Sequence, residues 1–152
     1  MSVSILIISH GSIGSSLIDA AQQMIGGYNT LKIAALDADI ALDADIESTL
    51  DELYKKSSTL VKELDQGDGI LILTDLFGST PSNIAHHLSK KNDISVVAGI
   101  NLSMLVRVLN APHLNLEEMT EKAYSGGIEG IKINGEYFLI NPEGSSIADK
   151  RD

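Results

Sequence analysis

The sequence contains no cysteine among its 152 residues. This absence excludes disulfide frameworks, thiolate metal sites and cysteine nucleophiles, and it gives no indication of an oxidising compartment. Basic residues are also few, because 11 lysines and arginines stand against 21 aspartates and glutamates, which leaves a formal charge of -10. A chain of this charge repels nucleic-acid phosphates and anionic lipid, so we expect neither as a partner.

Long hydrophobic runs are missing as well. The apolar run Ile5–Ile8 is far shorter than the roughly 20 residues that cross a bilayer, and the first residues carry no positive charge. We therefore expect no signal peptide, no membrane insertion and a cytoplasmic location. With 43% hydrophobic residues and three prolines, the composition is typical of one globular domain, which we assign to residues 1–140, followed by a polar tail at residues 141–152.

Short apolar runs alternate with segments of helical spacing along the chain. This alternation predicts an α/β fold: a doubly wound, mostly parallel sheet of about four strands with helices on both faces. An Asn134-Gly135 turn between two β-rich runs predicts a C-terminal antiparallel edge strand or hairpin over Ile131–Ile140. The strands of the parallel sheet are expected at Val3–Ser9, Leu31–Leu36, Gly69–Thr74 and Ser95–Ile100.

Capping residues predict where several helices begin and end. The first helix should start at Ile13 and end at Gly26-Gly27, since glycine favours the left-handed conformation of a helix stop. Thr80 and Pro81 are interpreted as an N-cap followed by proline at the first helical position. Asn115 with Glu118 resembles a capping box at the head of a last helix that ends at Gly126-Gly127.

Ligands of such sheets bind beyond the carboxyl ends of the strands, and His10 is the first polar residue of consequence there. It is followed by Gly11, Ser12 and Gly14 at the entrance to a helix. Free backbone N–H groups and the helix dipole at such a turn attract an anion, so a histidine beside it suggests phosphoryl chemistry. The alternative is a histidine that only caps or hydrogen-bonds a strand end.

A second polar segment, Thr74–Asn83, follows another buried strand and also enters a helix. Asp75 occupies the position equivalent to His10, and if the strands are neighbours its carboxylate can fix the imidazole tautomer and stabilise an imidazolium. The alternative is that Asp75 and Thr80 only cap a turn and a helix. Small and hydroxyl residues suited to phosphoryl oxygens follow Asp75: Gly78, Ser79, Thr80 and Ser82.

Together, the segments Ser9–Gly14 and Thr74–Asn83 resemble the enzyme IIA domains of the mannose family of the bacterial phosphotransferase system. The resemblance extends from Val3 to about Lys132, and two separated motifs in the right order are specific where either alone is weak. It implies a small α/β domain that carries a phosphoryl group on His10. Members of the family commonly form homodimers in which the last strand can be exchanged, so we expect a homodimer.

The resemblance also implies partners and roles. His10 would receive the phosphoryl group from the histidine phosphocarrier protein and pass it to an enzyme IIB partner for sugar uptake. Asp75 would orient the imidazole, and the phosphoryl group would be held by the region of Thr80 and Ser82. No metal and no organic cofactor are expected.

Two departures from the family pattern stand out. Members usually have a second glycine where Ser79 stands, and no enzyme IIB domain follows in this chain, so we expect the acceptor in trans. The alternative is a regulatory module of an incomplete phosphotransferase system, whose His10 phosphorylation state controls a partner. Two further alternatives are the related subunit of dihydroxyacetone kinase and a receiver-like domain phosphorylated on Asp75.

Other segments are weaker candidates. Leu76 and Phe77, beside Asp75, are predicted either as an apolar docking patch or as core. Arg107 is predicted either to touch the donor protein or to form a surface ion pair. An identical tandem hexapeptide, Ala35–Ile40 and Ala41–Ile46, is interpreted as a solvated loop rather than a cation site. No catalytic role is assigned to the three remaining histidines, His86, His87 and His113.

Overall fold

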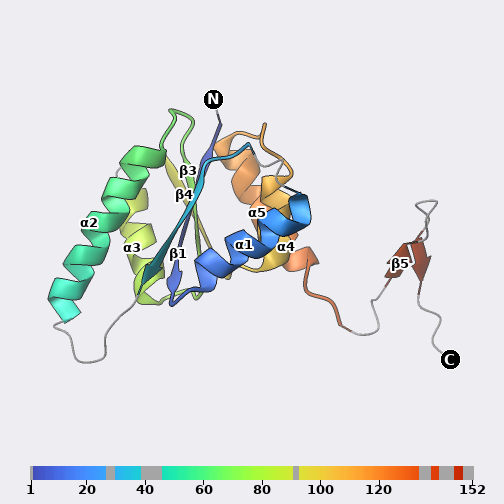
Figure 1. The fold of residues 1–152 in the computed structure, drawn as a ribbon, viewed down its shortest axis with the longest axis horizontal. Coiled ribbons are helices and arrows are strands. Elements are labelled where there is room, and N and C mark those ends of the chain that lie inside the picture. The colour runs from blue at the N-terminus through green and yellow to red at the C-terminus, as the bar shows by residue number, and fades with distance from the viewer. Residues whose placement is uncertain are drawn as a thin grey trace.

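Four parallel strands form the central sheet of the computed structural model, which describes residues 2–26, 30–38, 46–90, 93–133, 138–140 and 146–148. The sheet order is β2-β1-β3-β4 (Figure 1). Since β1 and β3 occupy its middle, the loops that follow these two strands lie side by side at the carboxyl edge. The strand bounds are β1 Ser4–His10, β2 Ile33–Ala38, β3 Ile70–Thr74 and β4 Ile94–Ala98.

Helices cover both faces of this sheet, which confirms the predicted doubly wound α/β fold (Figure 1). One face carries α1 (Ile13–Ile25), α4 (Leu102–Leu109) and α5 (Leu116–Glu129). The other face carries α2 (Ile46–Leu64) and α3 (Thr80–Ser89). Among the described residues no helix has the length and apolar character needed to cross a membrane.

The two hydrophobic cores follow the alternation of side chains along the central strands. Ile5 and Ile7 of β1 belong to the core beneath α1, α4 and α5, whereas Leu6 and Ile8 belong to the core beneath α2 and α3. These four residues are fully buried, as expected for a strand covered on both faces. The same alternation places Ser9 on the α1 side and His10 on the α2 and α3 side.

The helix α1 ends as predicted, with Gly26 in the left-handed conformation at φ 74°. The prediction for the last helix is wrong at its end, because α5 continues through Gly126 and Gly127 to Glu129. These two glycines serve helix packing instead. A Cβ on Gly126 would lie 2.8 Å from the Cβ of Arg107 in α4, so the missing side chain permits the close approach of α4 and α5.

The C-terminal strands differ from those predicted. Ile131–Ile133 form no strand, and the Asn134-Gly135 turn lies outside the described residues. An antiparallel pair is present, but it joins β5 (Phe138–Ile140) to β6 (Ser146–Ala148), and β6 falls within the predicted polar tail. The domain boundary at residue 140 stays a prediction.

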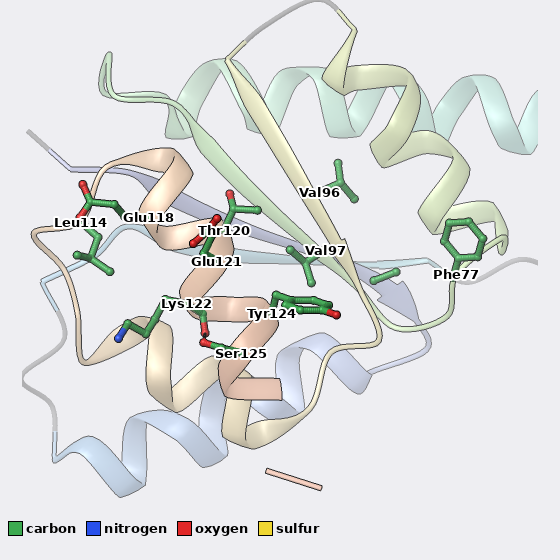
Figure 2. Close-up of a pocket in the computed structure, with 11 residues that line it drawn as sticks. Phe77, Val96, Val97, Leu114, Glu118, Thr120, Glu121, Lys122, Tyr124 and Ser125 are labelled. Atoms are coloured by element: carbon green, nitrogen blue, oxygen red, sulfur yellow. Dashed lines mark hydrogen bonds between the residues drawn. The ribbon is translucent and has the colours of Figure 1, made fainter. Parts of the chain in front are cut away.

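The strand β4 lies at an edge of the four-stranded sheet, and all five of its residues are partly exposed. A cavity of about 1030 Å³ runs along this edge (Figure 2). Val96 and Val97 of β4, Tyr124 of α5 and Phe77 from the loop after β3 contribute to its lining. The edge of the sheet therefore borders an open, largely apolar groove.

Candidate functional site

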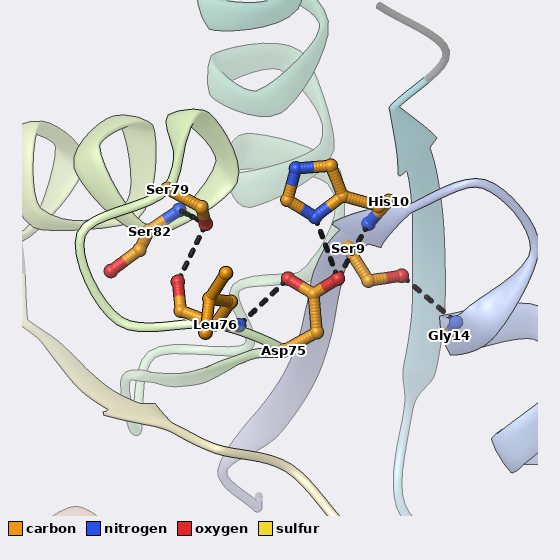
Figure 3. Close-up of polar contacts among 7 residues, drawn as sticks. All are labelled: Ser9, His10, Gly14, Asp75, Leu76, Ser79 and Ser82. Atoms are coloured by element: carbon orange, nitrogen blue, oxygen red, sulfur yellow. Dashed lines mark hydrogen bonds and ion pairs between the residues drawn. The ribbon is translucent and has the colours of Figure 1, made fainter.

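The side chains of His10 and Asp75 meet at the carboxyl edge of β1 and β3 (Figure 3). The imidazole Nδ1 lies 2.8 Å from Asp75 Oδ2, and the same oxygen accepts a hydrogen bond of 2.9 Å from the His10 backbone N–H. The histidine side chain is 42% exposed, whereas that of Asp75 is only 12% exposed. Two residues separated by 65 positions thus form one pair, with Nε2 as the ring nitrogen that Asp75 does not engage.

The carboxyl group of Asp75 is held in its ionised form. Its burial by itself raises the pKa, but the hydrogen bonds from the His10 backbone and ring, the charge of His10 and the Leu76 N–H outweigh that effect. The net pKa of Asp75 therefore lies below its ordinary value. A carboxylate in this position accepts a hydrogen bond from Nδ1 when Nδ1 carries the ring proton. The lone pair of the neutral ring then lies on Nε2.

The loop after β1 is fixed by a hydrogen bond to a side chain of the strand itself. Ser9, which is fully buried, accepts a hydrogen bond of 2.8 Å on its Oγ from the Gly14 N–H in the first turn of α1 (Figure 3). Ser12 stands at the N-cap of α1 but makes no side-chain capping bond. Gly11 has φ 50°, a conformation that favours glycine.

The role of Ser9 was not predicted from the sequence. Its signal was a serine at the end of an otherwise apolar buried strand, directly before a glycine-rich turn. Because Ser12 does not cap α1, Ser9 supplies the acceptor from the preceding strand and fixes the geometry of the residues that follow His10.

The loop after β3 is held by its own hydrogen bonds. The Leu76 N–H donates to Asp75 Oδ1 at 2.9 Å, and the Ser79 hydroxyl donates to the Leu76 carbonyl at 2.6 Å (Figure 3). Gly78 has φ 82° and permits the tight turn. These contacts orient the carboxylate of Asp75 toward His10.

The predicted capping of α3 by Thr80 is wrong by one residue. Ser79 is the N-cap, and its Oγ accepts the Ser82 N–H at 3.4 Å, so that Thr80 is the first helical residue and Pro81 the second. The Ser79 hydroxyl therefore has a defined structural role. Ser79, Thr80 and Ser82 nevertheless remain together at the N-terminus of α3, on the face of the sheet where His10 lies.

Several unpaired backbone donors lie in the two loops that adjoin the pair. Within the described residues, hydrogen-bond partners are lacking for the N–H groups of Gly11, Ser12, Gly78 and Thr80. They lie in two glycine turns at the N-termini of α1 and α3, where unpaired N–H groups favour an anion. The site thus combines a half-exposed imidazole with donors suited to phosphoryl oxygens.

The three residues predicted as docking candidates lie in two different parts of the molecule. Leu76 and Phe77 are exposed to 63% and 86%, and both lie in the loop beside Asp75, so they are not core. Arg107 lies in the last turn of α4 and forms an ion pair of 2.8 Å with Glu129. Both partners of that pair are about half exposed, and the structure does not bring Arg107 together with His10.

The repeated hexapeptide is only partly described. Its residues 39–45 lie outside the described part of the chain. Asp37, at the end of β2, accepts a hydrogen bond of 2.5 Å from the Ser15 hydroxyl in α1. Among the described residues no three histidine, aspartate or glutamate side chains gather as a metal site.

A comparison with protein families matches residues 4–124 to the family described as the PTS system fructose IIA component, EIIA-man. The chain belongs to the mannose family of enzyme IIA components. The matched residues include both loops of the site. Proteins of this family are components of a phosphotransferase system. The resemblance inferred from the two motifs is therefore confirmed.

Individual relatives agree with this assignment. The enzyme IIA chain is 27% identical over 135 residues to the "PTS system mannose-specific EIIAB component" of Escherichia coli K12, covering 87% of this chain but only 39% of that protein. It is 24% identical to the "PTS system fructose-specific EIIA component" of Bacillus subtilis, covering 89% and 88% of the two chains. The chain thus spans well under half of the mannose-specific relative.

A solved structure has the same fold. The mannose/sorbose-specific IIA subunit of the phosphotransferase system from Enterococcus faecalis superposes with a TM-score of 0.71 at 25% identity. The superposition covers 88% of this enzyme IIA chain and 95% of the other. The agreement supports the sheet order and helix placement described above.

Proposed function

We propose that this enzyme IIA chain is a phosphocarrier that accepts a phosphoryl group on His10 Nε2 from the histidine phosphocarrier protein and passes it to an enzyme IIB partner. The observation that carries the proposal is the 2.8 Å contact between His10 Nδ1 and Asp75 Oδ2, made by a ring that is 42% exposed. This contact occupies one ring nitrogen and leaves the other for the reaction.

Asp75 is proposed to control the reactivity of the ring. With the carboxylate ionised, the tautomer with the proton on Nδ1 is favoured, and the lone pair resides on Nε2. When Nε2 forms a bond to phosphorus the ring becomes an imidazolium, and the adjacent negative charge stabilises it. Asp75 itself does not become phosphorylated in this scheme.

The transfer exchanges one nitrogen–phosphorus bond for another. His10 Nε2 attacks phosphorus in line with the leaving nitrogen of the donor phosphohistidine. The bond between that nitrogen and phosphorus breaks, its electron pair returns to the donor imidazole, and the proton on His10 Nδ1 stays beside Asp75. Onward transfer to a nucleophile of the acceptor restores His10. Positioning and charge stabilisation supply the catalysis, with no metal or organic cofactor in the step.

The two helix N-termini are proposed to hold the phosphoryl oxygens. Unpaired N–H groups of Gly11 and Ser12 directly follow His10 in the chain, and those of Gly78 and Thr80 lie in the loop that follows Asp75. The hydroxyls of Ser79 and Ser82 belong to the same turn of α3. Donors that are already oriented lose little entropy when the charged group arrives.

The exposed Leu76 and Phe77 side chains are proposed as the apolar centre of the surface to which donor and acceptor bind in turn. Their exposure and their position beside Asp75 support a role in an interface that reaches His10. The charge of -10 favours basic partners and accelerates their encounter. A cytoplasmic location stays a prediction.

A homodimer is also proposed. An edge strand with unpaired backbone groups is normally covered, and the groove along β4 offers an apolar surface for a second copy of the chain. Sedimentation analysis tests this proposal: a dimer is expected at micromolar concentration, and a monomer at every concentration would contradict it.

The phosphocarrier proposal is tested by mixing the protein with enzyme I, histidine phosphocarrier protein and phosphoenolpyruvate, and measuring the intact mass. One acid-labile phosphate is expected, and it should be absent from His10→Ala. His113→Ala is the control and should be phosphorylated normally, because His113 is exposed in the connection between α4 and α5. A base-labile phosphate on Asp75 would favour a receiver-like protein, and no phosphate with a competent donor would overturn the carrier function.

A further inference from the structure

A second cavity, of about 510 Å³, opens between α2 and α3. Leu50, Asp51 and Tyr54 line it from α2, and α3 contributes Thr80, Asn83, Ile84 and His87. Its size lies within the range of ordinary ligand pockets, about 300 to 1000 Å³. No step of the phosphoryl transfer uses it.

The lining has the chemistry of a cation site. Asp51 is its one charged side chain apart from the titratable His87, and the described lining contains no lysine or arginine. Within the described residues Asp51 has neither an ion pair nor a hydrogen-bonded partner. The rings of Tyr54 and His87 pack edge to face at 5.8 Å and 79° and form an aromatic wall near it. A carboxylate beside aromatic rings suits an ammonium or guanidinium group.

The position of the cavity connects it to the reacting histidine. Thr80 is the first residue of α3 and belongs both to this cavity and to the turn that contains Ser79. From Thr80 to His87 the helix rises by about 10 Å, at about 1.5 Å per residue. A typical interface covers about 800 Å² on each partner, so an interface centred on His10 is large enough to include Thr80 and the cavity that it lines.

We propose that the cavity between α2 and α3 receives a lysine or arginine side chain of the protein that delivers the phosphoryl group to His10. The proposal rests on the proposed phosphocarrier function and adds a recognition subsite to it. Asp51 pairs with the cationic head, while Tyr54 packs against its apolar stem. The subsite contributes to binding of the donor and leaves the chemical step unchanged.

The test measures the initial rate of His10 phosphorylation as a function of the concentration of phosphorylated histidine phosphocarrier protein. Asp51→Asn should raise KM about tenfold with kcat within about twofold, as loss of uniform binding requires. Glu63→Gln is the matched control. It changes the same charge on an exposed residue of the same helix about three turns away, and its KM should equal that of the wild type.

Salt provides the second readout. The KM of the wild type should rise more steeply with ionic strength than that of Asp51→Asn, since one ion pair is lost in the variant. Equal KM values for Asp51→Asn and Glu63→Gln, with a wild type that is phosphorylated normally, would overturn the subsite alone. A wild type that this donor does not phosphorylate would overturn the phosphocarrier function and the subsite together.

Discussion

The loops at the ends of β1 and β3 share a general sequence pattern but differ in structure. Both contain glycine and enter a helix, and both have one reactive side chain at the strand end: His10 is the last residue of β1, and Asp75 is the first residue after β3. The β1 loop presents a half-exposed imidazole and receives its helix-capping acceptor from the strand, through Ser9. The β3 loop buries its carboxylate and is held by bonds among Asp75, Leu76 and Ser79. In the proposed function, one loop presents the nucleophile, and the other is the fixed support that orients it.

The strongest test of this division is Asp75→Ala. Loss of the carboxylate removes control of the His10 tautomer and the charge that stabilises the imidazolium, so the phosphorylation rate should fall about a thousandfold. His10 should remain the modified residue, which peptide mapping under alkaline conditions can establish. A phosphorylation rate within a factor of two of the wild-type rate would show that the Asp75 carboxylate is not needed for the reaction at His10.

Ser9→Ala tests whether the β1 loop depends on its strand. The Gly14 N–H would lose its acceptor in a buried site, which should lower the free energy of unfolding by about 1 to 2 kcal/mol. A small displacement of the turn after His10 should also slow phosphorylation about tenfold. Urea unfolding and the transfer assay measure the two effects.

Ser4→Ala is the matched control for that variant. Ser4 is fully buried in the same strand and donates a hydrogen bond to the Leu64 carbonyl, at the end of the strand away from His10. It should destabilise the protein to a similar extent and leave the transfer rate unchanged. Equal slowing by both variants would mean that Ser9 acts only through stability.

Ser79→Ala tests the N-cap of α3 in the β3 loop. The helix would lose the acceptor for the Ser82 N–H, so the free energy of unfolding should fall by about 1 kcal/mol. Thr80→Ala should cost less, because Thr80 is inside the helix and not at the cap. Urea unfolding measures both variants. If Thr80→Ala lowered the free energy of unfolding more than Ser79→Ala, the N-cap would be Thr80 and not Ser79.

The smallest expected effect concerns pH. Because folding lowers the pKa of Asp75, the stability that it contributes is present above the unfolded pKa, at about pH 4, and is lost as the pH falls through the folded pKa. The difference in unfolding free energy between wild type and Asp75→Asn should therefore be largest near neutral pH and shrink below about pH 4. A difference that is constant from pH 7 to pH 3, measured by urea unfolding, would contradict the assigned cause.

Much of the fold could be predicted because it depends on local patterns. Buried strands and amphipathic helices leave clear periodicities, so the parallel sheet and the start of α1 at Ile13 were correct. The predictions were wrong where the same residue type is compatible with two different structural roles. Gly126 and Gly127 read as a helix stop, yet they permit contact between α4 and α5. The N-cap of α3 is Ser79 and not the predicted Thr80, because serine and threonine are both good capping residues and the two are adjacent.

The sequence by itself determined which residues are proposed to carry the chemistry of this enzyme IIA chain. His10 and Asp75 could be identified because each follows a buried strand and precedes a glycine turn, and the absence of cysteine left few other nucleophiles. Only the tertiary structure decided that β1 and β3 are neighbours, which brings side chains 65 residues apart to 2.8 Å. Strand order depends on how helices pack on both faces of the sheet, and no local pattern encodes that packing.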